Sequence, residues 1–146
     1  MSGASAIVRS AFEIPAFHIS PDDTVRLAAL AGPPQGSSTS VFLEIWEPGG
    51  SQPVNSHPDS AEIFIVLKGQ AAAHSDDLEL VLTVGDILVL QPGSEHRIIN
   101  TSTTERLYTI TVMANDNGFW DLVTRGIPTS LEERDLHVLL SPASSD

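Results

Sequence analysis

Two histidines and one glutamate stand out because their spacing could bring three metal-binding groups together. Asn55 and His57 are two residues apart, so on an extended strand they project to the same face. Glu62 opens the next β-rich run, and His96 follows the turn dipeptide Pro92-Gly93. Two imidazoles and a carboxylate suit Fe(II), Mn(II), Ni(II), Co(II) or Zn(II), and they leave coordination positions open for a substrate or oxygen.

These residues must be positioned by short strands. Glycine and proline number ten each and divide the chain into runs rich in Val, Ile, Leu, Phe and Thr. Short strands at such close intervals favour a sandwich or barrel over alternating strands and helices. The expected strands are Thr24–Leu30, Ser40–Trp46, Glu62–Lys68, Leu78–Leu82, Asp86–Leu90, Arg97–Ile99 and Arg106–Met113.

The C-terminal part changes character. Asp116-Asn117 can cap a short helix over Phe119–Arg125, and Ser130 with Glu133 has the form of a capping box. Leucines at near-helical spacing follow. We expect small helices that pack outside the barrel as a structural cap.

Length and composition limit the possibilities. The 146 residues predict a single domain over 1–146, with a barrel core at about 24–113 and a C-terminal helical cap at about 116–140. The formal charge of −12 argues against nucleic acid and anionic membranes as partners. Cysteine is absent, which excludes thiol chemistry. No apolar run is long enough to span a bilayer and no signal peptide is evident, so the expected location is cytoplasmic.

Two stretches resemble the signature motifs of the cupin superfamily. The first aligns as Gly49, five residues, Asn55, one, His57, four, Glu62, six, Gly69. The second aligns as Gly85, five residues, Gln91, one, Gly93, two, His96, three, Asn100. Every spacing of the family motifs is met. Asn55 replaces the first histidine and Gln91 replaces a proline.

The resemblance implies an all-β fold, a double-stranded β-helix (the cupin jelly-roll barrel, of the RmlC-like type) with short C-terminal helices. It also implies a pocket at one mouth of the barrel. The family's metal ligands fall on Asn55, His57, Glu62 and His96. The expected cofactor is one divalent transition-metal ion (Fe, Mn, Ni, Co or Zn).

Asn55 leaves three alternatives open. Its amide oxygen could ligate the ion weakly, its side chain could orient a bound water or substrate, or the site could have lost its metal. Asp59 is a possible substitute ligand, although it is expected to face the turn. Arg97 is adjacent to His96, so strand alternation turns it away from the ion. His74 could face either the pocket or solvent.

Two functions fit these residues. The first is a metal-dependent enzyme, with a dioxygenase as the first guess, that acts on a small polar organic molecule. The second is a non-catalytic module that binds a small ligand or a metal. We also expect a homodimer, as in similar cupins. The apolar stretch Ile7–Ile19 is too isolated to form a core alone and could cover an edge strand of a partner.

Overall fold

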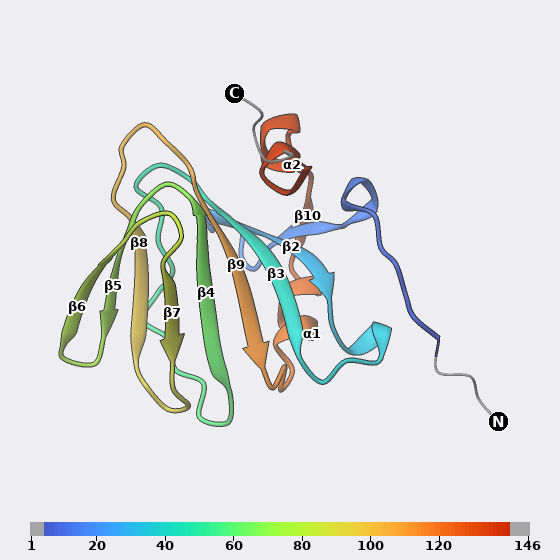
Figure 1. The fold of residues 1–146 in the computed structure, drawn as a ribbon, viewed down its shortest axis with the longest axis horizontal. Coiled ribbons are helices and arrows are strands. Elements are labelled where there is room, and N and C mark those ends of the chain that lie inside the picture. Colours follow the sequence, from blue (N-terminus) through green and yellow to red (C-terminus); the bar gives the residue numbers. More distant parts are fainter. Residues whose placement is uncertain (1–4, 141–146) are drawn as a thin grey trace.

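The computed structural model describes residues 5–140, which form two antiparallel sheets wrapped around one interior (Figure 1). The large sheet has the strand order β10-β1-β2-β3-β9-β4-β7, and the small sheet has the order β6-β5-β8. The strands are β1 (Ala16–His18), β2 (Val25–Ala31), β3 (Ser40–Trp46), β4 (Ala61–Lys68), β5 (Ala71–Ser75), β6 (Leu78–Leu82), β7 (Ile87–Leu90), β8 (His96–Asn100), β9 (Leu107–Ala114) and β10 (Ile127–Thr129). This is the jelly-roll architecture of the expected fold class.

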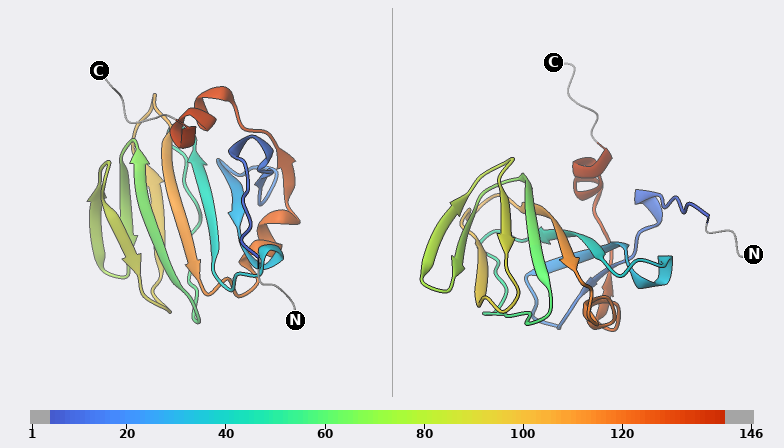
Figure 2. Two further views of the ribbon diagram at one scale, coloured as in Figure 1. Left: turned by 45° about the vertical axis from the view of Figure 1, so that its right-hand side comes forward. Right: turned by 60° about the horizontal axis from the view of Figure 1, so that its bottom comes forward.

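The helices are short. They are two 3-10 turns, Ala11–Glu13 and Pro33–Gln35, and two α-helices, α1 (Phe119–Thr124) and α2 (Glu133–Leu140). Figure 2 shows α1 at one end of the barrel and α2 on the outer side of the large sheet.

An irregular segment joins the two motifs in space. Ser51 forms an isolated β-bridge with Ile99, and Asn55 forms one with His96. Residues 51–55 therefore run along the free edge of β8. The segment that carries the first motif is in this way fixed beside the strand that carries the second.

The main core fills the space between the sheets. Strand alternation places Glu62, Phe64 and Val66 of β4 on the inner face, where all three are buried. Phe42 and Trp46 of β3 are likewise buried, and the rings of Trp46 and Phe64 lie 6.4 Å apart. The polar site residues thus project from strands whose neighbouring inward side chains form a packed apolar core.

A second apolar cluster lies on the outer face of the large sheet, under α2. Its members include Leu43, Ile45 and Tyr108 from the sheet and Val138 and Leu139 from α2. The burial of these side chains on the outside of the sheet explains why β3 is apolar at nearly every position.

A buried carboxylate anchors α2. Asp135 is fully buried and accepts hydrogen bonds from Arg26 Nη1 (2.8 Å), Tyr108 Oη (2.7 Å) and Arg106 Nη1 (3.0 Å). Its second oxygen also accepts the Glu132 backbone N–H at 2.8 Å. Asp135 therefore joins the start of α2 to strands β2 and β9.

The rest of the outer face carries aliphatic side chains. Ile63 lies beside Val89 and Val112 in the strand register, and Ile65 lies beside Ile87 and Ile110. Ile87 and Val89 are 64% and 57% exposed, so α2 does not cover them. We call this set the aliphatic face: Ile63, Ile65, Ile87, Val89, Ile110 and Val112.

The expected strands are all present, and each of their ends agrees with the expectation or differs from it by one residue. Three strands were not expected: β5 because it opens with three alanines, and β1 and β10 because each is three residues long. Residues 16–18, part of the stretch predicted to cover a partner, instead pair with β2 and β10 of the same chain. Among residues 5–140, no helix has the length and apolar character to cross a membrane; the cytoplasmic location stays a prediction.

Both predicted helices form, but they differ in detail. Asp116 caps α1 as expected, since its Oδ1 accepts the Trp120 N–H at 2.8 Å. The predicted capping box is not what starts α2, because the side chain that accepts the backbone N–H there is Asp135. Only α2 lies on the outside of the barrel. The buried side chains of α1, including Phe119 and Trp120, join the main core.

Candidate metal centre

A tight turn fixes the approach of the two motifs. Gly93 has φ +86°, a conformation that residues with a side chain rarely adopt, and its N–H donates to the His57 carbonyl at 2.9 Å. Asn55 and His96 exchange two backbone hydrogen bonds, each 2.8 Å long. These backbone hydrogen bonds therefore fix the positions of both histidines independently of any contact between their side chains.

Three side chains converge on one point. His96 Nε2 lies 3.0 Å from Glu62 Oε1, and His57 Nε2 lies 3.4 Å from the same oxygen. The two imidazole rings are 5.6 Å apart between centroids. His57, Glu62 and His96 thus form the set whose ligand atoms all lie within 4.8 Å of one another in the described part of the chain.

This geometry fits a metal ion. Ligand atoms that each lie about 2.0–2.2 Å from one ion are themselves roughly 3.0–3.5 Å apart. Glu62 Oε1 is buried yet makes no well-formed hydrogen bond with any described residue, although two imidazole nitrogens face it. An acceptor oxygen and two nitrogen atoms that approach without bonding to one another leave a common position for a cation.

The charges support the same conclusion. Burial raises the pKa of Glu62, but the two histidines lower it more, so the pKa lies below the usual 4.5 and the carboxylate is ionised at neutral pH. Burial lowers the pKa of His96, but the Glu62 carboxylate and the Ser94 carbonyl raise it above 6.5. His96 Nδ1 lies 3.3 Å from Ser94 O, so its N–H at Nδ1 leaves the Nε2 lone pair directed at the centre.

Asn55 also reaches the centre. Its Nδ2 lies 3.3 Å from His57 Nε2, while its Oδ1 accepts the backbone N–H of Ser56 at 2.9 Å. The amide nitrogen, rather than the oxygen, therefore faces the histidine. Asp59 is exposed in the turn, as expected, and His74 lies on the outward side of β5 with Ala72.

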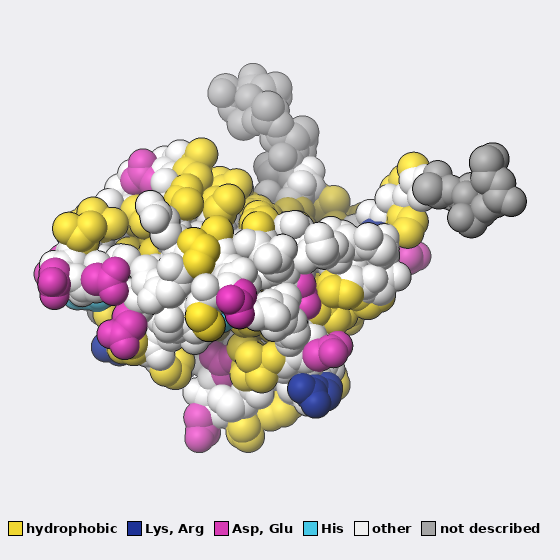
Figure 3. Space-filling model, turned by 90° about the horizontal axis from the view of Figure 1, so that it is seen from below, with side chains coloured by type: hydrophobic (Ala, Val, Ile, Leu, Met, Phe, Trp, Pro, Cys, Tyr) yellow, Lys and Arg dark blue, Asp and Glu magenta, His cyan; other side chains and the backbone are white. Residues whose placement is uncertain are grey.

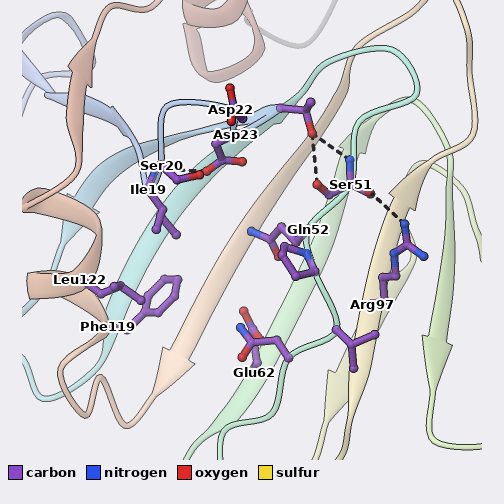
Figure 4. Close-up of a pocket in the computed structure, with 14 residues that line it drawn as sticks. Ile19, Ser20, Asp22, Asp23, Ser51, Gln52, Glu62, Arg97, Phe119 and Leu122 are labelled. Atoms are coloured by element: carbon purple, nitrogen blue, oxygen red, sulfur yellow. Dashed lines mark hydrogen bonds between the residues drawn. The ribbon is translucent and has the colours of Figure 1, made fainter.

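A cavity of about 580 Å³ opens beside the centre, a size typical of small-molecule sites. Figure 4 shows Glu62 near its base, with Phe119 and Leu122 of α1 on one side and Arg97 on the other. The Arg97 guanidinium donates to Ser51 Oγ at 3.3 Å. Arg97 points away from Glu62, as strand alternation predicts, yet it lines this cavity.

A second buried carboxylate lies in the barrel interior. Glu44 of β3 is fully buried, and within residues 5–140 neither of its carboxyl oxygens has a hydrogen-bond partner of good geometry. Burial raises the pKa of Glu44 well above 4.5, and the negative charges of Glu62 and Asp23 raise it further. Glu44 therefore favours the uncharged carboxylic acid form more strongly than an exposed glutamate does.

Comparison with known proteins assigns the family. The model of the cupin domain matches residues 42–113, a span that holds all three converging side chains. Solved cupin structures share the fold as well, among them an RmlC-like cupin from Shewanella frigidimarina. The chain is a member of the cupin superfamily.

The relatives of this cupin are distant. The oxalate-binding protein of Thermotoga maritima is 29% identical over 58 residues, which are 40% of this chain and 48% of that protein. The match therefore spans about half of that relative. A predicted oxalate decarboxylase of Thermotoga maritima superposes with a TM-score of 0.65 at 22% identity, over 75% of this chain and 99% of that one. The Shewanella protein has a TM-score of 0.67 at 14% identity, over 80% and 96%. At such identities the two structures show the fold alone.

Sequence reasoning missed part of the site of this cupin. Phe119 lies in T-shaped contact with His57, with ring centroids 5.9 Å apart, although the helix that carries it was expected outside the barrel. Its aromatic character gave no reason to prefer the pocket over the core. Glu44 had a readable signal: it alternates with Phe42 and Trp46 and so must share their buried face.

Proposed function

We propose that this cupin binds one divalent transition-metal ion through His57, Glu62 and His96 and acts on a small polar organic molecule in the adjoining cavity. The observation that carries the proposal is the convergence of two imidazole nitrogens on the unpartnered oxygen of Glu62. A 2-His-1-carboxylate set is typical of Fe(II) oxygenases, so a dioxygenase is the first reaction class to test. When bound, the ion would polarise a ligand or activate oxygen.

Other residues of the chain orient a ligand of the ion, exclude water and offer hydrogen bonds to the bound molecule. The Ser94 carbonyl holds the tautomer of His96, and the backbone pairing with Asn55 holds its position. Phe119 and Leu122 place apolar surface against the cavity and exclude water from one side of the bound molecule. Arg97 and the polar residues of segment 51–55 offer hydrogen-bond donors on the other side.

The test begins with the metal. Purified protein is loaded with Fe(II), Mn(II) or Co(II), and its metal content and melting temperature are compared with those of His96→Ala and of the control His74→Ala. Metal that binds only the folded state raises the melting temperature, so wild type and His74→Ala gain stability and His96→Ala gains little. If His96→Ala retains metal as well as wild type, the ligand assignment is wrong.

The second candidate is a non-catalytic module that binds a metal or small ligand. The replacement of the first motif histidine by Asn55 favours it, because loss of one imidazole weakens a transition-metal site. Oxygen uptake by the Fe(II) protein, measured with oxalate and other small carboxylates, separates the two functions. Oxalate is the first compound to test because a relative is named as binding it. Uptake that depends on both ligand and metal supports an enzyme; tight binding without turnover supports a module.

We also propose that two copies pair through the aliphatic face. Its six side chains are uncharged and lie side by side, whereas the chain as a whole carries −12. Two such chains repel one another least where no charge is present, and an apolar patch is complementary to a copy of itself. On the face shown in Figure 3, acidic side chains are more frequent than basic ones.

A further inference from the structure

The orientation of the Asn55 amide is fixed by its neighbours. The Ser56 N–H is a donor and requires an acceptor, which Asn55 Oδ1 provides at 2.9 Å. The backbone of Asn55 is held by two hydrogen bonds to His96. Nδ2 must therefore be the atom that faces His57 Nε2, at 3.3 Å.

This orientation matters for the metal centre. In the tautomer that leaves His57 Nε2 unprotonated, its one lone pair accepts from Asn55 Nδ2, and the same lone pair would bind the ion in the loaded protein. Asn55 Nδ2 then loses its acceptor while it still faces the centre. Asn55 also lines the large cavity and a smaller one of about 250 Å³ beside Phe119, so its N–H is accessible to a bound molecule.

We propose that Asn55 is not a metal ligand but donates a hydrogen bond from Nδ2 to an oxygen of the molecule bound beside the ion, and so selects small carboxylates. The inference rests on the proposed function, because it assumes an ion at His57, Glu62 and His96. An amide N–H favours an acceptor oxygen over a ligand that presents only N–H or C–H groups next to the metal.

The rest of the cavity agrees with a carboxylate ligand. Arg97 is the one basic residue among the described residues that line it, and it lies at the rim on the side of Ser51 (Figure 4). Asp22 and Asp23 also line the cavity, on the side away from Glu62 in Figure 4. Both oxygens of Asp23 already accept backbone N–H groups, from Ile19 and Val25. Phe119 and Leu122 form the opposite, apolar wall. A ligand whose carboxylate contacts Asn55 and whose apolar portion contacts α1 would therefore fit both the polar side and the apolar wall of the cavity.

The experiment compares two probes on the Co(II)-loaded protein, followed through the visible absorption of the ion. Oxalate presents acceptor oxygens beside the metal, whereas imidazole binds Co(II) without offering an acceptor to Asn55. The variants are Asn55→Ala, Asn55→Asp and His57→Ala, with Gln70→Ala as a control that removes an exposed amide far from the centre. Melting curves of the metal-free variants verify that each is folded, and elemental analysis after each titration verifies that Co(II) stays bound.

We expect Asn55→Ala to weaken oxalate binding by about tenfold and to change Co(II) and imidazole affinity by no more than about twofold. Asn55→Asp weakens oxalate binding further, because a carboxylate repels the probe, while Co(II) binding persists. Gln70→Ala matches wild type.

Three outcomes overturn the inference. If Asn55→Ala loses Co(II) as severely as His57→Ala does, Asn55 is a ligand. If oxalate and imidazole are affected equally, or neither is affected, Asn55 does not select the ligand. If the wild-type protein binds no metal at all, the proposed function fails and this inference fails with it; only that outcome removes the Co(II) absorption of the wild type itself.

Discussion

At the scale of single residues, Glu44 and Glu62 show how position decides the state of a carboxyl group. Both point into the barrel and both are buried. Glu62 faces two imidazoles, which lower its pKa, whereas burial and the negative charges of Glu62 and Asp23 raise the pKa of Glu44. The pKa values of two glutamates in one interior are therefore shifted in opposite directions.

The raised pKa of Glu44 predicts a stability that depends on pH. Below pH 4.5 the folded and unfolded chains both protonate Glu44, but above it only the unfolded chain ionises, so wild type loses stability as pH rises toward the folded pKa. Glu44→Gln removes that loss and should be more stable than wild type at pH 7, by up to about 1.4 kcal/mol for each pH unit between the two pKa values. Urea unfolding of the metal-free proteins at pH 4 and pH 7 measures this difference in stability between Glu44→Gln and wild type.

The exposed residue Glu79 provides the control for this experiment. Glu79→Gln should match wild type at both pH values. A Glu44→Gln protein that is less stable than wild type at pH 7 would mean that Glu44 is charged and paired when the protein is folded.

Restoring the family's missing histidine is a second test at this scale. Asn55 faces the centre, so Asn55→His places a fourth ligand there and should raise Co(II) affinity by about tenfold, or 1.4 kcal/mol. The same change removes the amide donor and should weaken oxalate binding to the loaded protein. Isothermal titration measures both affinities, and unchanged Co(II) affinity would show that position 55 does not face the ion.

The residues of the centre were predictable because His57, Glu62 and His96 lie within 39 positions of one another, at the spacings of the cupin motifs. Glu62 and His96 were identified through that resemblance, and the structure places His96 Nε2 3.0 Å from Glu62 Oε1. The direction of the Asn55 amide was not predictable, since it depends on the N–H of Ser56 and on the turn that follows. Hydrogen bonds of that kind leave no periodic pattern in a sequence.

At the scale of elements, α2 depends on a contact that the sequence does not reveal. Arg26 and Asp135 are 109 positions apart and meet through a hydrogen bond of 2.8 Å. Arg106 joins them, and burial together with Asp135 raises the pKa of Tyr108 to about 12. The sequence predicted that a helix would exist near residue 133, but only the folded sheet brings two arginines to its first turn.

Removing the charge of Asp135 should release this helix. Asp135→Asn leaves Arg26 without its buried counter-ion, which should cost about 3–5 kcal/mol in the free energy of unfolding at pH 7. Burial raises the pKa of Asp135, but Tyr108, the Glu132 N–H and Arg26 lower it more, to below 3.8. The stabilisation is therefore complete above pH 3.8 and disappears as pH falls through the lower, folded pKa.

Denaturant unfolding between pH 2.5 and pH 7 tests this, with the exposed Glu133→Gln as a control on the same helix. The difference in the free energy of unfolding between wild type and Asp135→Asn should become smaller as the pH falls toward 2.5. The free energy of unfolding of Glu133→Gln should follow that of wild type at every pH. A difference that does not vary with pH would show that the charge of Asp135 is unimportant.

At the scale of the whole molecule, the aliphatic face predicts the oligomeric state. Ile87→Lys introduces a charge into this face, on the edge strand β7, and should convert a dimer of about twice 15.6 kDa to a monomer. Val81→Lys is the control, because Val81 is 76% exposed on the other sheet. Light scattering at micromolar concentration measures the mass; a wild-type mass near 15.6 kDa would contradict the pairing.

The cavity and the centre beside it combine residues from inside and outside the span that matches the cupin domain. His57, Glu62 and His96 lie within residues 42–113, the part that matches the cupin domain. Ile19, Phe119 and Leu122, which line the cavity together with Glu62, lie before or after that span. Substitutions in these flanking segments can reshape what fits in the cavity without touching the three residues that could hold an ion. The extensions of such a barrel can therefore alter the choice of ligand while the converging side chains stay in place.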